Sequence, residues 1–418
     1  MKMKLAICVL MCFHLSLFAQ QDAWVYLKDK QNVASSIENP TSILSQKAID
    51  RKNAHGIVID ERDVPVNENY ISQLKNVTGI TVMTKSKWLN SVHVRGSQTD
   101  IEDLLHLDFV ASIDFADKSL NTSKLTKQKK VSKLESVTTV FNYGNASNQI
   151  EMIKGDKLHL SNYTGAGMTV AVLDAGFPNV NTIEGFKRLR DAGNILGVYD
   201  FVDRDSNVYS NTTSNHGTLV LSTMAGYVQD QFVGTAPDAA YYLFVTEDGF
   251  KENPVEESYW VEAAERADSL GVDVINSSLG YGSFYDNPNY NYAASDFDGN
   301  TAFITKGATI AFEKGMLIVN SAGNEGIAGI NAPADAVGVF SIGAVDADGN
   351  YASFSSRGSS YQPTQKPDVV AQGQASYVIT ENNSIATANG TSFSAPILAG
   401  GIVCLWQAMP DKTNAEIM

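Results

Sequence analysis

Beyond residue 143 the chain alternates short apolar runs, rich in β-branched residues, with longer helical segments, and this alternation constrains the fold most strongly. Strands are predicted over Met168–Asp174, Tyr241–Thr246, Val272–Asn276, Met316–Ser321 and Val339–Val345, and helices near His216–Gly226, Val255–Leu270, Thr301–Lys314 and Ser392–Gln407. Apolar strands that alternate with helices predict a doubly wound α/β fold, in which a mostly parallel sheet is covered on both faces. Sites in such sheets form at the carboxyl ends of the strands.

The preceding segment, residues 22–117, has a different pattern. Strands are predicted at Trp24–Leu27, Ile80–Thr84, Ser91–Val94 and Val110–Phe115. Helices are predicted over Ser42–His55 and Ile71–Val77, and a third helix, with Thr99 or Asp100 as its N-cap, is predicted to end at Leu107. The order β-α-β-β-α-β predicts a small α+β, ferredoxin-like sandwich. Residues 118–142 are polar and have little to bury, and five closely spaced lysines lie between Asn121 and Val137, which is typical of a linker that proteases can cut.

The first 19 residues predict a secretory signal peptide, because Lys2 and Lys4 precede an apolar run that ends at Ala19. The alternative is a buried N-terminal helix. The run is short for a bilayer span, and no later segment is predicted to cross a membrane. Export would leave Cys404 as the only cysteine, so we expect no disulfide framework and a secreted or extracytoplasmic protein.

Charge is distributed unevenly along the 418 residues. Residues 1–140 contain 18 Lys and Arg against 15 Asp and Glu, a net charge of +3, which leaves −18 for residues 141–418. Such an acidic domain without a basic stripe would repel a phosphate backbone, so nucleic-acid binding is not expected. At the other end, Thr413–Glu416 has the pattern of a capping box, yet the sequence stops at Met418, so we expect residues 143–418 to be a domain shortened at its C-terminus.

Three residues could carry nucleophilic chemistry, although each also has an ordinary structural interpretation. Asp174 ends a predicted strand, where a carboxylate is either a turn cap or a catalytic group. His216 opens a predicted buried helix, and only His159 is also found after residue 140. Ser392 follows Gly390-Thr391 at the start of an apolar helix, where an N-cap role is equally compatible with the pattern.

Two further segments could bind a substrate. Asn324 lies in a glycine-flanked turn after a strand, and its amide could donate to an oxyanion or simply occupy a turn. Ser278-Leu279-Gly280 follows another predicted strand and could offer a backbone edge to an extended peptide. Ala322-Gly323 precedes Asn324 directly.

Together these motifs resemble the subtilisin-like serine proteases. The residues that carry the resemblance occur in the Asp…His…Ser order of that family; they are Asp174-Ala175-Gly176, His216-Gly217-Thr218, Ser278-Leu279-Gly280, Ala322-Gly323-Asn324-Glu325-Gly326 and Gly390-Thr391-Ser392-Phe393-Ser394-Ala395-Pro396. The α+β unit before them resembles the inhibitory propeptide of the same family.

The resemblance implies that Ser392 attacks a peptide carbonyl, that His216 transfers the proton, and that Asp174 orients the imidazole. It also implies that Asn324 binds the oxyanion, with Ser278–Gly280 and Ala322-Gly323 lining the substrate cleft. Protein or peptide substrates and the chain's own propeptide, as an intramolecular inhibitor, are the expected partners. Three positions depart from the family pattern, in residues that touch no reacting atom: Ala175, Leu219 and Phe393.

No cofactor is required for this chemistry, but structural calcium is a weaker expectation. Asp203 and Asp205, and again Asp296 and Asp298, place carboxylates at alternating positions, although both loops lack the glycine and glutamate positions of an EF-hand and could be solvated turns. The leading hypothesis is a secreted, self-processing zymogen. The alternative is a catalytically silent binding protein of the same fold, whereas an α/β-hydrolase esterase is disfavoured because no G-x-S-x-G motif occurs.

Overall fold

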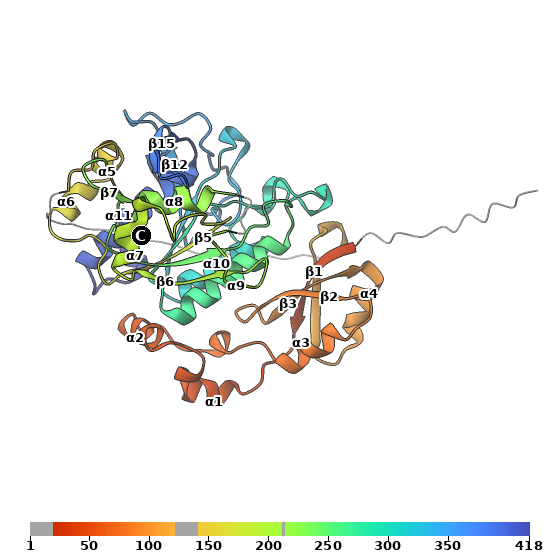
Figure 1. The fold of residues 1–418 in the computed structure, drawn as a ribbon. Helices are drawn as coiled ribbons and strands as arrows, with labels where there is room; N and C mark the ends of the chain where they lie inside the picture. The colour runs from red at the N-terminus through yellow and green to blue at the C-terminus, as the bar shows by residue number, and fades with distance from the viewer. Residues whose placement is uncertain (1–19, 122–140, 211–213) are drawn as a thin grey trace, which may run out of the picture.

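The computed structural model describes residues 20–121, 141–210 and 214–418, in a small N-terminal part and a large second part (Figure 1). The predicted signal peptide at residues 1–19 and most of the predicted linker at 118–142 lie outside the described residues.

The small part contains the predicted split βαβ arrangement. Its antiparallel sheet has the order β2-β3-β1-β4. The strands are β1 (Gln20–Leu27), β2 (Thr81–Ser86), β3 (Ser91–Ser97) and β4 (Val110–Phe115), and helices α3 (Glu68–Lys75) and α4 (Gln98–Asp103) follow β1 and β3 in the chain. Side chains alternate between the two faces of β1, so Ala23 and Val25 enter the small part's own core, whereas Trp24 packs into a core of the large part.

Two helix starts differ from the sequence prediction because another residue supplies the cap. The Oγ of Ser97 accepts the N–H of Asp100 at 3.1 Å, so Ser97, rather than Thr99 or Asp100, is the N-cap of α4. The helix expected from Ser42 begins at Gln46, because Ser45 caps it and a separate 3₁₀ turn precedes it. This helix, α2 (Gln46–Ala54), and α1 (Val33–Glu38) belong to a long excursion between β1 and β2.

The large part is built on the predicted parallel sheet. Seven strands follow the order β13-β12-β11-β10-β5-β9-β6, and every pairing between neighbours is parallel. They are β5 (Thr169–Asp174), β6 (Ile195–Asp200), β9 (Ala240–Val245), β10 (Val274–Ser277), β11 (Leu317–Ser321), β12 (Val339–Val345) and β13 (Val369–Gln372). The two edge strands, β6 and β13, were not predicted from the sequence.

The strand order reverses beside β5. From β5 the chain moves outward to β6 and returns through β9, and it then continues on the other side of β5 from β10 to β13. Loops that leave β5 and β10 therefore diverge, and in sheets of this kind ligands bind at the carboxyl ends of the strands at such a point. Asp174 and Ser278 lie at these two strand ends.

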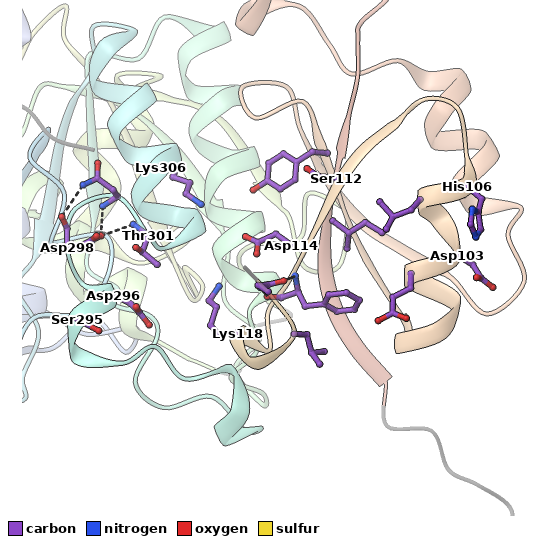
Figure 2. A pocket seen from close by; sticks show the side chains of 18 residues that line it. Asp103, His106, Ser112, Asp114, Lys118, Ser295, Asp296, Asp298, Thr301 and Lys306 are labelled. Carbon is purple, nitrogen blue, oxygen red and sulfur yellow. Dashed lines mark hydrogen bonds between the residues drawn. The ribbon is translucent and has the colours of Figure 1, made fainter. Parts of the chain in front are cut away.

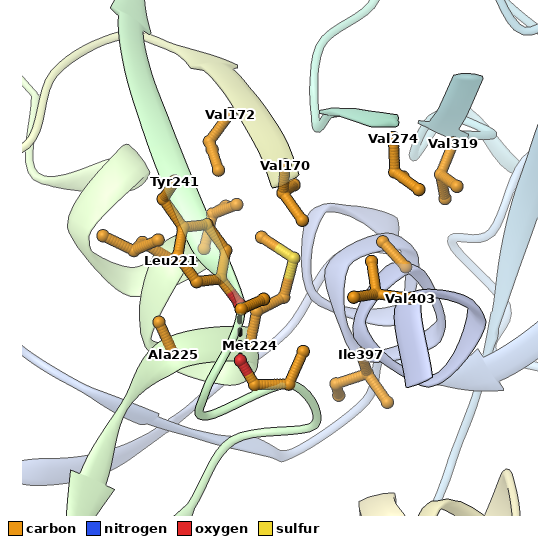
Figure 3. Close-up of a cluster of buried hydrophobic side chains, with 14 of the residues drawn as sticks. Val170, Val172, Leu221, Met224, Ala225, Tyr241, Val274, Val319, Ile397 and Val403 are labelled. Carbon is orange, nitrogen blue, oxygen red and sulfur yellow. Dashed lines mark hydrogen bonds between the residues drawn. The ribbon is translucent and has the colours of Figure 1, made fainter. Parts of the chain in front are cut away.

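Helices cover both faces of the sheet. Val170 and Val172 of β5 pack with α8 (His216–Ala225) and α11 (Thr391–Ala408) on one face, as Figure 3 shows. Ala171 and Leu173 pack with α9 (Val255–Leu270) and α10 (Phe303–Glu313) on the other. The shorter elements are α5 (Ser147–Met152), α6 (Gly155–His159), α7 (Lys187–Asp191), α12 (Asn414–Ile417) and the hairpins β7 (Tyr227–Val228) with β8 (Phe232–Val233) and β14 (Ser376–Ile379) with β15 (Ile385–Ala388).

Helix α11 has the length and composition of a membrane span, the one such helix among the described residues. Within the fold, 72% of α11 is buried, and the apolar side chains of this helix belong to the core shared with β5 and α8. Its apolar character is accounted for by this packing. The capping box predicted near the last residues is also confirmed. At the start of α12 the Thr413 side chain accepts the backbone N–H of Glu416, and the Glu416 side chain accepts the backbone N–H of Thr413.

Candidate active site

Asp174 and His216 form a hydrogen-bonded pair at the carboxyl edge of the sheet. Asp174 is the last residue of β5 and is fully buried, and His216 is the first residue of α8. The Nδ1 of His216 lies 2.8 Å from Oδ1 of Asp174, which also accepts the N–H of Ala175 at 2.7 Å. A carboxylate acceptor at Nδ1 favours the tautomer with its proton there, so Nε2 presents a lone pair.

The carboxylate also changes the acidity of the imidazole. Burial disfavours the charged form of His216, but attraction to Asp174 and the hydrogen bond between them outweigh it, and the pKa of His216 is raised above its ordinary value. Gly217 allows the start of α8 to lie close to the turn after Asp174, because a Cβ at this position would lie 2.4 Å from the carbonyl oxygen of Gly176. A side chain there would push α8 away from the turn after Asp174.

Ser392 lies in the first turn of α11, and its carbonyl has an unusual partner. Pro396, four residues later, has no N–H to donate to the Ser392 carbonyl, as a regular helix would require. The hydroxyl of Ser278 donates to that carbonyl instead, at 2.9 Å. The Oγ of Ser392 in turn donates to the Ser278 carbonyl at 3.3 Å, so the start of α11 is joined to the loop after β10.

Two N–H donors flank a small space beside Ser392. The Oδ1 of Asn324 accepts the backbone N–H of Thr391 at 2.9 Å and its hydroxyl at 3.1 Å, which fixes the amide plane with Nδ2 on the other side. A Cβ placed on Gly390 would lie 3.7 Å from both Asn324 Nδ2 and the Ser392 backbone nitrogen. Both donors therefore border one region, which glycine leaves open.

The segments predicted to line a substrate cleft lie on neighbouring strands. Ser278–Gly280 follows β10, whose pairing with both neighbours ends at Ser277. Ala322-Gly323 follows the adjacent strand β11, and the Gly323 N–H donates to the Thr391 hydroxyl at 3.2 Å. The structure thus brings all the predicted catalytic and substrate segments to one edge of the sheet.

Sequence reasoning missed two functional contacts. Thr391 orients Asn324, and the Ser278 side chain supports the Ser392 carbonyl. Only the second had a signal in the sequence, because Pro396 reveals that a helical carbonyl four residues earlier needs another donor. His159, by contrast, is a buried structural residue: its ring bonds Tyr143 and the Thr235 carbonyl, and burial lowers its pKa.

A cavity of about 1540 Å³ lies elsewhere, between β4 and residues 295–306 (Figure 2). Asp296 and Asp298 border it, and Asp298 accepts the N–H groups of Asn300 and Thr301. Asp205 similarly accepts the N–H of Asn207. The described residues contain no group of three or more His, Cys, Asp or Glu arranged to hold a metal ion, and calcium binding stays a prediction.

Two family models match the chain. Residues 165–418 match the model of the subtilase family, and residues 22–134 match a peptidase S8 propeptide domain of Bacteroidota.

Among similar proteins, subtilisin E of Bacillus subtilis (strain 168) is 31% identical over 273 residues, which cover 64% of this chain and 63% of that protein. Subtilisin DY of Bacillus licheniformis is 30% identical over 273 residues, which cover 64% of this chain and 87% of that protein. A solved structure described as a cold adapted subtilisin-like serine proteinase matches with a TM-score of 0.48 and 25% identity, over 61% of this chain and 81% of that one. The match to the first relatives thus spans slightly less than two thirds of their length.

Proposed function

This chain belongs to the subtilase family, and on that premise we propose that it is a serine endopeptidase made as a self-processing zymogen. The observation that carries the proposal is the bond between His216 Nδ1 and Asp174 Oδ1, which prepares Nε2 to accept a proton at the edge of the sheet where Ser392 lies in the first turn of α11. The substrates are proteins or peptides, and export uses the signal sequence predicted at residues 1–19.

In the proposed reaction, Ser392 Oγ attacks the peptide carbonyl while His216 accepts its proton and later gives it to the leaving amine. Asp174 remains ionised and stabilises the imidazolium that forms between these steps. The Asn324 amide and the Ser392 backbone N–H bind the negative oxygen of the tetrahedral intermediate, where one donor of this kind contributes about 3 kcal/mol. Water, deprotonated by His216, then attacks the acyl group left on Ser392, and the acid product leaves as the serine hydroxyl is restored. These side and main chains and water complete the reaction, so it needs no cofactor.

The Ser392 hydroxyl donates to the Ser278 carbonyl in this structure, and it must turn to His216 before it reacts. Rotation about one side-chain bond is a small step, and catalytic hydrogen bonds commonly tighten only when substrate is bound. An extended substrate would pair with the backbone of Ser278–Gly280 as an added strand, which would place its carbonyl beside the two oxyanion donors.

A fluorophosphonate probe tests the nucleophile directly. We expect covalent labelling of the processed protein at Ser392, no labelling of Ser392→Ala, and normal labelling of Ser394→Ala. Ser394 is the matched control because it lies in the same turn but is buried and donates to the Thr391 carbonyl. Labelling that survives in Ser392→Ala would overturn the assignment.

Intact mass tests self-processing and the competing binding-protein hypothesis. The wild-type protein should lose about its first 120–142 residues, where the polar linker is predicted, whereas Ser392→Ala should keep its full mass. If both proteins stay whole while their circular dichroism shows a folded chain, the silent binding protein becomes the better description.

A further inference from the structure

The excursion between β1 and β2 carries the propeptide to a second face of the large part. We name residues 44–63 the clasp; they include α2 and the turn at Glu61–Asp63. In Figure 1 the helices α1 and α2 of this excursion lie apart from the propeptide sheet, below the large part. Lys47 bonds the Thr169 hydroxyl at 2.6 Å and Asp273 at 2.8 Å, so the clasp binds where β5 and β10 begin. The candidate active site lies at the opposite ends of these strands.

A buried network of charges joins the clasp to this face. Lys52 Nζ lies 2.9 Å from Asp268 of α9 and 3.2 Å from Asp63, and Lys314 Nζ, just after α10, lies 2.6 Å from Asp63. The side chains of all four residues are at most 1% exposed. Burial alone would raise the pKa of Asp63, but the two lysines lower it below its ordinary value, so its carboxylate stays charged.

Arg51 adds a second kind of contact in the same network. Its guanidinium bonds Asp268 and donates to the carbonyls of Val272 and Lys314. These carbonyls follow the C-terminal ends of α9 and α10, where helix dipoles concentrate negative charge. A single side chain of the propeptide therefore satisfies acceptors at the ends of two helices in the large part.

The shape of the face also matches the clasp. Gly271 and Gly315 adopt φ angles of 79° and 91°, which favour glycine. A Cβ at Gly271 would lie 2.7 Å from the Ala48 nitrogen, and one at Gly315 would lie 2.2 Å from Ile57 Cδ1. The clasp thus passes over two points where the large part has no side chain to obstruct it.

We propose that this face, formed by Asp268, Val272, Asp273 and Lys314, is a second binding site for the propeptide, which holds residues 44–63 whether or not the linker is intact. The clasp binds where the strands β5 and β10 begin, and Ser392 lies at the end of the sheet where these strands finish. The clasp therefore anchors the propeptide without competing with substrate. Buried pairs are screened little by salt, so the anchor persists at high ionic strength. The binding of the clasp does not depend on the proposed zymogen; only the role of this anchor during activation rests on that proposal.

The experiment uses the full chain with Ser392→Ala and a recognition site for a sequence-specific protease inserted between Thr122 and Val140. Because the cut is made by the added protease, the outcome does not depend on whether the chain processes itself. After cutting is verified by mass, size-exclusion chromatography and surface-immobilised complexes measure how fast the propeptide dissociates, at low salt and at 1 M salt. We expect the propeptide to stay bound in both conditions.

Asp268→Asn and Arg51→Met should each accelerate dissociation on the order of 100-fold or more, because each leaves buried charges without a partner. Arg51→Met leaves the large part unchanged in sequence, so its effect cannot come from misfolding there. Arg62→Gln is the matched control: its pair with Glu313 is 35% and 51% exposed, and its removal should change the rate less than about 5-fold. The proposal would be overturned if the propeptide left the Asp268→Asn and Arg51→Met complexes as slowly as it leaves the cut Ser392→Ala complex without these substitutions. It would also be overturned if the propeptide left that cut Ser392→Ala complex at low salt.

Discussion

The two oxygens of the Asp174 carboxylate have unequal surroundings. Oδ1 accepts from the His216 ring and the Ala175 N–H, whereas Oδ2 is buried and has no hydrogen-bond partner among the described residues. A buried acceptor without a donor costs about 1–3 kcal/mol. The next residue, Ala175, is one of the three that depart from the family pattern, and its side chain has no hydroxyl that could donate to this oxygen.

A hydroxyl at position 175 should therefore stabilise the protein. We expect Ala175→Thr to raise the free energy of unfolding by about 1–2 kcal/mol relative to Ala175→Val, which has the same shape without the hydroxyl. Denaturant titration of both variants in a Ser392→Ala background, where no self-cleavage interferes, measures the difference. Equal midpoints would mean that the Asp174 Oδ2 atom is already satisfied, for instance by a bound water.

The sequence indicated which residues gather at the site but not how they hold one another. Asp174, His216 and Ser392 stood at strand and helix ends, yet each pattern alone allowed a cap or a turn, and only the combination of motifs resembled a known family. Thr391 as the residue that orients Asn324 could not be predicted, because these side chains are 67 positions apart and their contact depends on how α11 meets β11.

At the scale of elements, the apolar pattern predicted the central strands and missed the edges. The central strand β5 is buried along its whole length, and its apolar run is unmistakable. In β6 only Asp200 is fully buried, and in β13 Val369 and Val370 are exposed, because an edge strand lacks a neighbour on one side. Edge strands therefore carry a weaker apolar signal than the strands that position the site.

The start of α11 depends on a donor from outside the helix. Ser278→Ala should leave the Ser392 carbonyl without a partner, lower the free energy of unfolding by about 1–3 kcal/mol and lower kcat, because the first turn that presents Ser392 loosens. Pro396→Ala restores an N–H four residues after Ser392, so the double variant should recover part of both losses. A double variant no better than Ser278→Ala alone would contradict this account.

At the scale of the whole molecule, the propeptide sheet is packed on the side of the large part opposite α8 and α11. Trp24 of β1 stacks on Phe303 with ring centres 4.7 Å apart, and its indole N–H donates to Ser258 of α9 at 2.8 Å. Trp24 and Trp88 belong to the same buried cluster as α9 and α10. Part of the large part's hydrophobic core is therefore completed by the propeptide.

Glu265 of α9 provides a measurable test of that dependence. Its carboxylate accepts the Ser86 hydroxyl, at the end of β2, at 2.6 Å and the N–H groups of Lys87 and Trp88, in the turn that follows, at 2.9 Å each. Glu265→Ala should leave these three buried donors unpaired and lower the free energy of unfolding of the Ser392→Ala full chain by about 3 kcal/mol. In a domain freed of the propeptide, Glu265 has lost these three donors, so the same substitution should change stability by less than about 0.5 kcal/mol. Denaturant midpoints of the two forms, each with and without Glu265→Ala, measure this difference. If both forms lost the same free energy of unfolding, Glu265 would stabilise the large part itself and would not act through propeptide docking.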